Sequence, residues 1–347
     1  MRTPSVAFVY QNPRVRLAEE VARGEAPDST LLGQNHLDAH GFDARIHDPA
    51  LTRRGSGRLR WHARELILPL ELGGYDAVVT PLAALFPLAA RLRRRTRVVV
   101  VNYGLTTMFE RSAAPRRRLL AAAARSAAAH IALADWQGET FARQAGLERE
   151  RWRTIPLGVD ERWFRAQPQP SADPVVLTVG KDEARDFATF AEAVDGLEAR
   201  VELAVYPRNL EGVRLPTNAR ARVVGPRELR DLYAESACVV VPQRGPEYPY
   251  GSEGGGLTAL LEAMASARAV VATSRPVVDE YVEHERTALV VPPEDPDALR
   301  AAIERVLDDR DLAARLGAAA REQVEREHTT RRFAERLAAL LRDLTMR

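Results

Sequence analysis

Short apolar segments rich in valine and isoleucine alternate with longer amphipathic segments along the first half of the chain. Strands of a parallel sheet are buried on both faces and are joined by helices, so this alternation is typical of repeated strand–helix units. The predicted strands of this half are 5–10, 44–48, 76–80, 97–102 and 130–134. A helix is predicted over 27–41, with Asp28 and Ser29 able to cap it and Gly41 able to end it.

The same alternation returns in the second half, after residues 162–174. That segment carries three prolines and no hydrophobic periodicity, which predicts a flexible linker between two domains. The strands predicted beyond it are 175–180, 201–205, 221–225, 238–242, 269–273 and 288–292. Helices are predicted to begin near Asp186, Pro226, Gly256 and Asp295, and Asp295 precedes a proline at the first helical position.

The last part of the chain, from about Asp311 to Arg347, is rich in Ala, Leu, Arg and Glu and predicts helix, with a break at Thr329 and Thr330. Together these patterns predict an α/β protein with two doubly wound, Rossmann-like domains that face a central cleft. Ligands bind beyond the carboxyl ends of the strands in such sheets. We therefore expect the functional residues on the loops that follow strands.

Composition fits two ordinary globular domains. The chain has 347 residues, of which 46% are hydrophobic and 28% charged. Its one cysteine, Cys238, excludes an intramolecular disulfide framework and any cluster of cysteine metal ligands. No stretch approaches 18 uninterrupted apolar residues, and the amino-terminal segment runs directly into a strand-like pattern without the features of a secretory signal. A cytoplasmic location is the expectation.

The formal net charge of +2 conceals an asymmetry between the two halves. Residues 1–165 contain 26 arginines and 17 acidic residues, a balance of +9, and the remainder balances to −7. A basic lobe suits an acidic ligand, nucleic acid or an anionic membrane surface, and a solvated basic face is the alternative. Lys181 is the single lysine beside 49 arginines, and this departure from the arginine default singles out its position.

Lys181 lies in the sequence VGKDEARDF, residues 179–187, which follows the first predicted strand of the second domain. Gly180 permits a sharp turn, and Lys181 and Arg185 then place two cations on one loop. A compact ammonium and a planar guanidinium together suit a diphosphate, whose oxygens are neutralised from more than one direction. Two solvated surface cations are the alternative interpretation.

A second candidate is YPYGSEGGGLTALLEAMA, residues 248–265. Its three consecutive glycines allow close backbone approach, and the helix that follows directs free N–H groups and its positive dipole end at a ligand. Glu262 lies six residues beyond Gly256, about 9 Å along a helix, where a carboxylate can accept hydrogen bonds from two vicinal ribose hydroxyls. A tight turn with an exposed glutamate is the alternative.

These segments, with ELRDLYAESACVVVPQ before them and PVVDEYVEHERTALVVPPEDPDALRAAIERVL after them, resemble the donor-binding domain of GT-B glycosyltransferases of family 4. The upstream IPLGVDERWF is similar to the domain junction of that family, and the resemblance covers about residues 130–310. In the first domain only the strand–helix layout is similar. The resemblance implies retaining transfer of a sugar from a nucleoside diphosphate sugar to an acceptor, without a metal or other cofactor.

Carried over residue by residue, the resemblance implies the following sites. The catalytic residues are Lys181, Arg185, Glu253 and Asn102. The donor-binding residues are Gly180, Gly225, Ser252, Gly255, Gly256, Leu257, Thr258 and Glu262. On the acceptor side are Tyr103 and Gly104.

Two positions depart from the family pattern. The first of two motif glutamates falls on Gly254, and Glu253 is one place early, so either Glu253 reaches the donor sugar or the carboxylate is dispensable. Many members have a histidine and glycine after the fourth strand, where this chain has Asn102, Tyr103 and Gly104. Asn102 can hydrogen-bond a donor hydroxyl but cannot accept a proton.

The implied domains are 1–165 for the acceptor, 166–328 for the nucleotide sugar, and a carboxyl-terminal helix over 329–347 that returns to the first domain. The expected partners are the nucleotide sugar and a small-molecule, glycan or lipid-linked acceptor, with no nucleic acid. The arginine runs 91–97 and 116–118 suggest an acidic acceptor or a peripheral contact with an anionic membrane, or else solvated helix ends. A nucleotide-sugar epimerase and a catalytically degenerate, nucleotide-binding partner subunit are the rival interpretations.

Overall fold

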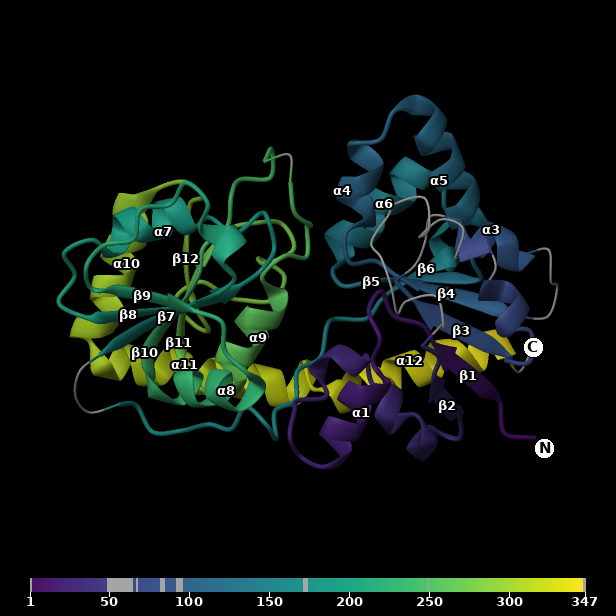
Figure 1. Cartoon of the computed structure of the whole chain (residues 1–347), viewed down its shortest axis with the longest axis horizontal. Coiled ribbons are helices and arrows are strands. Elements are labelled where there is room, and N and C mark those ends of the chain that lie inside the picture. The colour runs from purple at the N-terminus through teal and green to yellow at the C-terminus, as the bar shows by residue number, and fades with distance from the viewer. Residues whose placement is uncertain are drawn as a thin grey trace. The chain divides into compact units, whose positions relative to one another are not determined.

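The computed structural model describes residues 2–48, 65–66, 68–81, 85–91, 96–170, 174–248 and 250–345. The chain forms two compact units (Figure 1). The first unit contains residues 1–24, 30–156 and 330–347, and the second contains residues 25–29 and 157–329.

The first unit is built on a six-stranded, fully parallel sheet in the order β2-β1-β3-β4-β5-β6. Its strands are β1 (Ser5–Phe8), β2 (Asp43–Ile46), β3 (Ala77–Thr80), β4 (Arg97–Val101), β5 (Ala129–Ala132) and β6 (Trp152–Thr154). The central strands β3 and β5 are buried throughout, as expected where helices cover both faces of a parallel sheet.

Helices connect the strands of this unit and end it. They are α1 (Val15–Ala22), α3 (Phe86–Arg91), α4 (Leu105–Glu110), α5 (Ala114–Ser126), α6 (Asp135–Ala145) and α12 (Thr330–Thr345). Arg116 to Arg118 are exposed on α5, whereas the basic run 91–97 lies partly outside the described residues. Among the helices that the structure describes, none is both long and apolar enough to cross a membrane.

The second unit has its own six-stranded parallel sheet, in the order β12-β11-β10-β7-β8-β9. Its strands are β7 (Val175–Gly180), β8 (Arg200–Val205), β9 (Ala219–Arg222), β10 (Ser236–Val241), β11 (Ala269–Thr273) and β12 (Leu289–Val291). Its helices are α7 (Phe187–Val194), α8 (Pro226–Glu235), α9 (Leu257–Ala265), α10 (Pro296–Asp308) and α11 (Arg310–Glu327). The predicted fold class, two doubly wound α/β domains, is confirmed.

The strand order reverses direction once in each sheet. In the first unit β1 leads to β2 on one side, and β3 lies on the other side of β1. In the second unit β7 leads to β8, and β10 lies on the other side of β7. Loops that leave two neighbouring strands in opposite directions open a crevice at their carboxyl ends, which is where such sheets bind ligands.

The sequence-based expectation for 27–41 was wrong in its type of helix. Three short 3₁₀ helices replace it, η1 (Ser29–Leu31), η2 (Gln34–His36) and η3 (Asp38–His40). Leu32 and Gly33 have φ of 53° and 70°, and such left-handed residues cannot continue an α-helix. Gly41, with φ of 84°, does end the segment.

Two strand predictions also differ from the structure. The edge strand β6 was not predicted, because it has only three residues and only the first of them, Trp152, is apolar and buried. The strand predicted at 221–225 is shifted to Ala219–Arg222. It is an edge strand with no buried residue, so the apolar run from which it was predicted does not mark a core position. The other strand positions agree within the usual uncertainty at element ends.

The segment 157–165, placed in the first domain by the sequence, lies in the second unit. Trp163 and Phe164 are buried, and the Phe164 ring meets Tyr233 edge-on. Two arginines fix the backbone that follows. The Arg321 guanidinium donates to the Phe164 carbonyl at 2.8 Å, and the fully buried Arg268 donates to the carbonyls of Gln167 and Pro168. The first part of the predicted linker is therefore packed.

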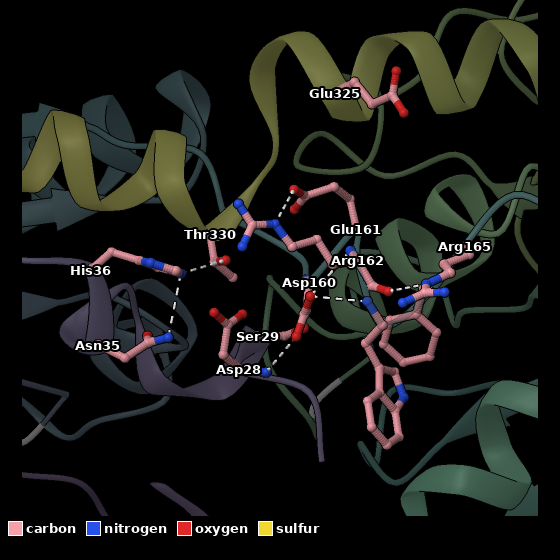
Figure 2. Close-up of polar contacts among 12 residues, drawn as sticks. Asp28, Ser29, Asn35, His36, Asp160, Glu161, Arg162, Arg165, Glu325 and Thr330 are labelled. Carbon is pink, nitrogen blue, oxygen red and sulfur yellow. Dashed lines mark hydrogen bonds and ion pairs between the residues drawn. The ribbon is translucent and has the colours of Figure 1, made fainter. Parts of the chain in front are cut away.

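Asp160 ties the short segment 25–29 to this part of the second unit (Figure 2). Its carboxylate accepts the Asp28 backbone N–H at 3.1 Å, and its own N–H donates to the Ser29 hydroxyl at 3.0 Å. The carboxylate also accepts the Trp163 N–H at 3.0 Å. Ser29, expected to cap a helix, thus serves as an acceptor for a distant backbone group instead.

The carboxyl-terminal helices break as predicted, between α11 and α12 at Thr329. Helix α12 belongs to the first unit, where a Cβ on Gly33 would lie 2.8 Å from the Cβ of Ala334. The Thr330 hydroxyl lies 3.3 Å from the His36 imidazole Nε2, as Figure 2 shows. The helix is thereby fixed to the 3₁₀ segment.

Gly138 of α6 offers a test of how the first unit packs against β6. A Cβ at this position would overlap the Trp152 indole. We predict that Gly138→Ala lowers the free energy of unfolding by about 1–3 kcal/mol, the usual effect of overpacking. Gly74→Ala, exposed and with open space around it, is the matched control. Equal urea midpoints for the two variants would contradict this packing.

Candidate functional site

The two loops at the reversal point of the second sheet are joined to each other by their backbones. The loop after β7 contains Lys181 to Asp186, and the loop after β10 begins at Pro242. The Asp186 N–H donates to the Pro242 carbonyl at 3.2 Å, and the Arg244 N–H donates to the Ala184 carbonyl at 2.8 Å. Arg185 and Gln243 form the bridge between these bonds. These bonds fix the two loops to each other.

Arg185 is buried at this position and forms no ion pair with any described residue, although the Asp182 carboxylate acts on it electrostatically. Only 5% of the residue is exposed, and its Nη2 donates to the Val179 carbonyl at 2.8 Å and to the Thr178 hydroxyl at 3.3 Å. Its Nε and Nη1 find no hydrogen-bond partner among the described residues. Burial lowers the pKa of the guanidinium to about 10, so the group is still charged at neutral pH.

Two glycines leave the space that this guanidinium occupies. A Cβ on Gly180 would lie 2.7 Å from its Nε, and a Cβ on Gly256 would lie 2.8 Å from its Nη1. Gly256 also has a φ of 88° as the residue before α9, a conformation that favours glycine. The predicted glycines therefore lie beside the two unpartnered nitrogens of Arg185.

Asp182 holds the glycine-rich loop in place. Its carboxylate accepts the Ser252 hydroxyl at 3.0 Å, the Ser252 N–H at 3.3 Å and the Ala184 N–H at 2.9 Å. A Cβ on Gly255 would lie 2.8 Å from the same carboxylate, so the loop approaches closely because glycine stands there. Ser252, predicted to bind the donor, has its hydroxyl engaged by Asp182.

Gln243 links the crevice floor to the start of α9. Only 1% of it is exposed, and its amide nitrogen donates to the Gly255 carbonyl at 2.6 Å. Its amide oxygen accepts from Arg275 at 3.0 Å, and its backbone N–H donates to the Thr273 hydroxyl at 3.1 Å. This network fixes the position of the α9 amino terminus relative to Arg185.

Glu262 lies on α9 and is 7% exposed. Its carboxylate accepts the phenol of the fully buried Tyr233 at 3.0 Å. Burial raises the pKa of Glu262 to about 7, against the opposing effects of the Tyr233 hydrogen bond and of the Lys181 charge. Lys181 itself is exposed. An exposed cation therefore acts on a carboxyl group whose pKa burial raises to about 7.

The other residues predicted for the second unit take different positions. Glu253 is 3% exposed in the loop before α9, and Leu257 is 1% exposed, with its side chain in the core. Thr258 is exposed in the first turn of α9. Gly225 precedes α8, and a Cβ there would meet only open space, so no close approach requires a glycine at this position.

The residues predicted for the first unit surround the end of β4. The Asn102 side-chain oxygen accepts the backbone N–H groups of Gly104 at 3.1 Å and Leu105 at 2.7 Å, and so caps α4. Its amide nitrogen donates to the Thr106 hydroxyl at 3.3 Å. Asn102 is only 1% exposed, and this capping role was not foreseen from the sequence.

Asp182, Gln243 and Tyr233 are the site residues that sequence reasoning missed. Asp182 and Gln243 both lie directly after predicted strands, which was a usable signal. Tyr233 lies on α8, and nothing in its local sequence indicates its contact with Glu262, 29 positions further along the chain. In the part of the chain that the structure describes, no three His, Cys, Asp or Glu side chains are grouped so as to hold a metal ion.

Two family models match successive parts of the chain. A model described as "Glycosyltransferase Family 4" matches residues 13–163, and one described as "Glycosyl transferases group 1" matches residues 173–309. This chain belongs to the family 4 type of GT-B glycosyltransferases. A curated relative is the α-D-kanosaminyltransferase of Streptomyces kanamyceticus, which is 26% identical over 271 residues, 69% of this chain and 67% of that protein.

Solved structures share the fold of this chain along nearly the whole length of both proteins. Sucrose-phosphate synthase of Thermosynechococcus elongatus superposes with a TM-score of 0.75 at 18% identity and covers 99% of each chain. The crystal structure of Anabaena HepE in complex with UDP and glucose superposes with a TM-score of 0.71 at 15% identity, over 96% of this chain and 98% of HepE. At such low identity these likenesses show the fold.

The raised pKa of Glu262 predicts a pH-dependent stability of the glycosyltransferase. The folded state holds this proton up to about pH 7, whereas the unfolded state releases it near pH 4.5. The contribution of Glu262 to the free energy of unfolding is therefore fully present below pH 4.5 and is lost as the pH rises to 7. We predict that the stability of wild type relative to Glu262→Gln falls by about 2–3 kcal/mol from pH 5 to pH 8. Urea unfolding at the two pH values measures it.

The exposed Glu192 on α7 supplies the control for this measurement. Glu192→Gln removes a carboxylate from the same unit without touching the crevice. Its stability relative to wild type should stay nearly constant over the same pH range. A Glu262→Gln difference that is equally flat would show that the carboxyl group is not perturbed by burial.

Proposed function

We propose that this glycosyltransferase moves a sugar from a nucleoside diphosphate sugar to an acceptor hydroxyl, with retention at the anomeric carbon and without a metal ion. The observation that carries the proposal is the buried Arg185 guanidinium, two of whose nitrogens have no partner in the described chain. An uncompensated buried charge is costly, and an anionic ligand that reached those nitrogens would compensate it.

A diphosphate is the anion that fits the surroundings of Arg185. Lys181 adds a second, exposed cation four residues earlier on the same loop. The amino terminus of α9, preceded by Gly256, supplies backbone N–H groups and the positive end of a helix dipole. Arg185 can act as a fixed fork and Lys181 as a mobile charge on the outer phosphate oxygens.

The same groups would act on the chemical step. The bond between the anomeric carbon and the β-phosphate oxygen breaks, the acceptor oxygen bonds to that carbon, and the acceptor proton passes to the released phosphate or to water. Negative charge therefore develops on the β-phosphate as the bond breaks. Preorganised cations and N–H donors aimed at that oxygen stabilise the transition state, and they do so without reorganising.

The remaining predicted residues receive roles in the same proposal. Glu262 would accept hydrogen bonds from the ribose hydroxyls once it is ionised, with Tyr233 fixing its orientation. Glu253 would take the place of the missing glutamate at 254 and contact the donor sugar. Asn102 would act by shaping the turn that carries Tyr103 and Gly104, because its side-chain oxygen already accepts two backbone N–H groups.

Relatives give independent support for a nucleotide-sugar donor. The HepE structure holds UDP and glucose, and another of its structures holds UDP-glucose. The Streptomyces relative is named for the transfer of a kanosaminyl group. We propose a hexose or amino-hexose nucleotide as the donor class.

Lys181→Ala tests the diphosphate assignment. We predict that the variant binds its nucleoside diphosphate more weakly by about 1.5–3 kcal/mol, the usual contribution of a hydrogen bond to a charged group. Isothermal titration calorimetry measures the affinity. Arg220→Ala, which removes an exposed cation from β9, is the matched control and should bind as wild type does. An unchanged affinity in Lys181→Ala would contradict the assignment.

A thermal-shift panel of UDP, GDP, ADP and TDP identifies the base. A ligand that binds only the folded state stabilises it by about 2.7 kcal/mol at a concentration of 100 Kd. We predict a clear rise in Tm with one base and little with the others. No rise with any of the four would contradict nucleotide binding at this crevice.

A further inference from the structure

The first unit has its own reversal point, and a cation lies beside it. The loop after β1 runs from Val9 to Arg14 and leads into α1. β1 is the strand at which the order of this sheet reverses, with β2 on one side and β3 on the other. Ligands bind at the carboxyl ends of strands where the strand order reverses, and in the first unit that position is the loop after β1.

Arg14 is the charged side chain of this loop. Its Nε is buried and has no hydrogen-bond partner among the described residues, and its guanidinium forms no ion pair with any of them. The guanidinium carbon lies 6.0 Å from the centre of the Tyr10 ring, so the group rests against an aromatic face. The side chain thus packs on the Tyr10 ring, and its guanidinium donates no hydrogen bond to a described residue.

Asp48, which follows β2, binds the backbone of the same loop. Its Oδ2 accepts the backbone N–H groups of Arg14 at 2.8 Å and Val15 at 2.9 Å, and its Oδ1 accepts the Arg14 N–H at 3.0 Å. Asp48 therefore caps the start of α1 and fixes the backbone of Arg14. The negative charge of Asp48 would weaken the binding of an anion beside Arg14.

Two phenols lie within the electrostatic reach of Arg14. Burial raises the pKa of Tyr10 and of Tyr103, and the Arg14 charge opposes both shifts, so both phenols stay protonated at neutral pH. The Tyr10 hydroxyl donates to the Leu31 carbonyl at 2.7 Å. The Tyr103 hydroxyl has no hydrogen-bond partner in the described part of the chain and can donate to a ligand.

We propose that Arg14 and the Tyr103 hydroxyl form an anion-binding subsite in the first unit that takes a phosphate or carboxylate group carried by the acceptor. Arginine suits both groups because its planar fork matches two oxygens at once. The assignment to the acceptor rests on the proposed function, whereas anion binding at Arg14 does not.

The distribution of charge favours the acceptor as the source of the anion. The second unit already offers Lys181, Arg185 and a helix amino terminus to the donor diphosphate. Residues 1–165 carry 26 arginines against 17 acidic residues, so the half of the chain that holds Arg14 attracts anions of its own. An acidic acceptor would be drawn to this half and oriented by Arg14.

Phenylglyoxal labelling of the full-length protein tests the subsite, because the reagent modifies arginine and the labelled peptide is identified by mass spectrometry. The probe is inorganic phosphate, compared with chloride at equal ionic strength. We predict that phosphate slows the labelling of Arg14 about threefold when present at twice its Kd, from simple occupancy. Arg16, two residues further and 90% exposed at its side chain, is the internal control and should label at an unchanged rate.

A second arm separates the two sources of the anion. UDP, or whichever nucleoside diphosphate raises the Tm most, is added at saturation before labelling. If Arg14 still labels quickly, and phosphate still protects it, the subsite belongs to the acceptor as proposed. If the nucleotide alone protects Arg14 fully, the arginine binds the donor and the acceptor assignment is overturned.

Variants complete the test. Tyr103→Phe should weaken phosphate protection of Arg14, because it removes one donor and leaves the ring in place. Arg14→Gln should leave the Tm shift by nucleotide unchanged, as should Arg16→Gln. Equal phosphate effects on Arg14 and Arg16 in the wild-type protein would overturn the subsite, and would do so even if nucleotide binding in the second unit were confirmed.

Discussion

The second unit is organised around an arginine side chain that the fold buries without an ion pair to any described residue. Arg185 is 5% exposed, and only one of its three nitrogens has a partner in the described chain. Gly180 and Gly256 leave room for the side chain, and Asp182 and Gln243 fix the loops around it. Removal of a charge from water costs several kcal/mol, and the charge of the nearby Asp182 carboxylate offsets part of that cost.

One topological rule relates this crevice to the first unit. Both sheets are parallel, both reverse their strand order once, and both carry an arginine with an unpartnered Nε on the loop after the strand at that reversal. In the second unit that arginine is Arg185, and in the first it is Arg14. If both arginines bind anions as we propose, each unit of the fold contributes one position for an anion.

The sequence predicts the two sheets well because buried parallel strands leave an unambiguous apolar run, as in the strands β7, β10 and β11. It fails where the hydrophobic pattern carries no such information. The segment 27–41 has a helical composition, but left-handed residues at Leu32 and Gly33 break it into 3₁₀ turns. The three-residue edge strand β6 buries too little to leave a pattern.

The candidate site shows the same division. Lys181, Arg185 and Glu262 were predicted from short motifs in the sequence. In the structure Arg185 lies in the loop after β7 and Glu262 lies on α9, and both are buried. Tyr233 was not predicted, because its bond to Glu262 depends on how α8 packs beside α9. The capping role of Asn102 was missed because the family resemblance implies a ligand contact at this position, whereas its side-chain oxygen binds the backbone of α4.

The most direct measurement of the central claim is the stability of Arg185→Met with and without a saturating nucleoside diphosphate. Methionine keeps much of the volume and removes the uncompensated charge. The account predicts an unliganded variant within about 1 kcal/mol of wild type, or more stable, since apolar replacements of buried charges are often neutral or stabilising. It also predicts that most of the stabilisation by the nucleotide is lost. A variant that is strongly destabilised without ligand, yet gains as much stability from the nucleotide as wild type, would contradict it.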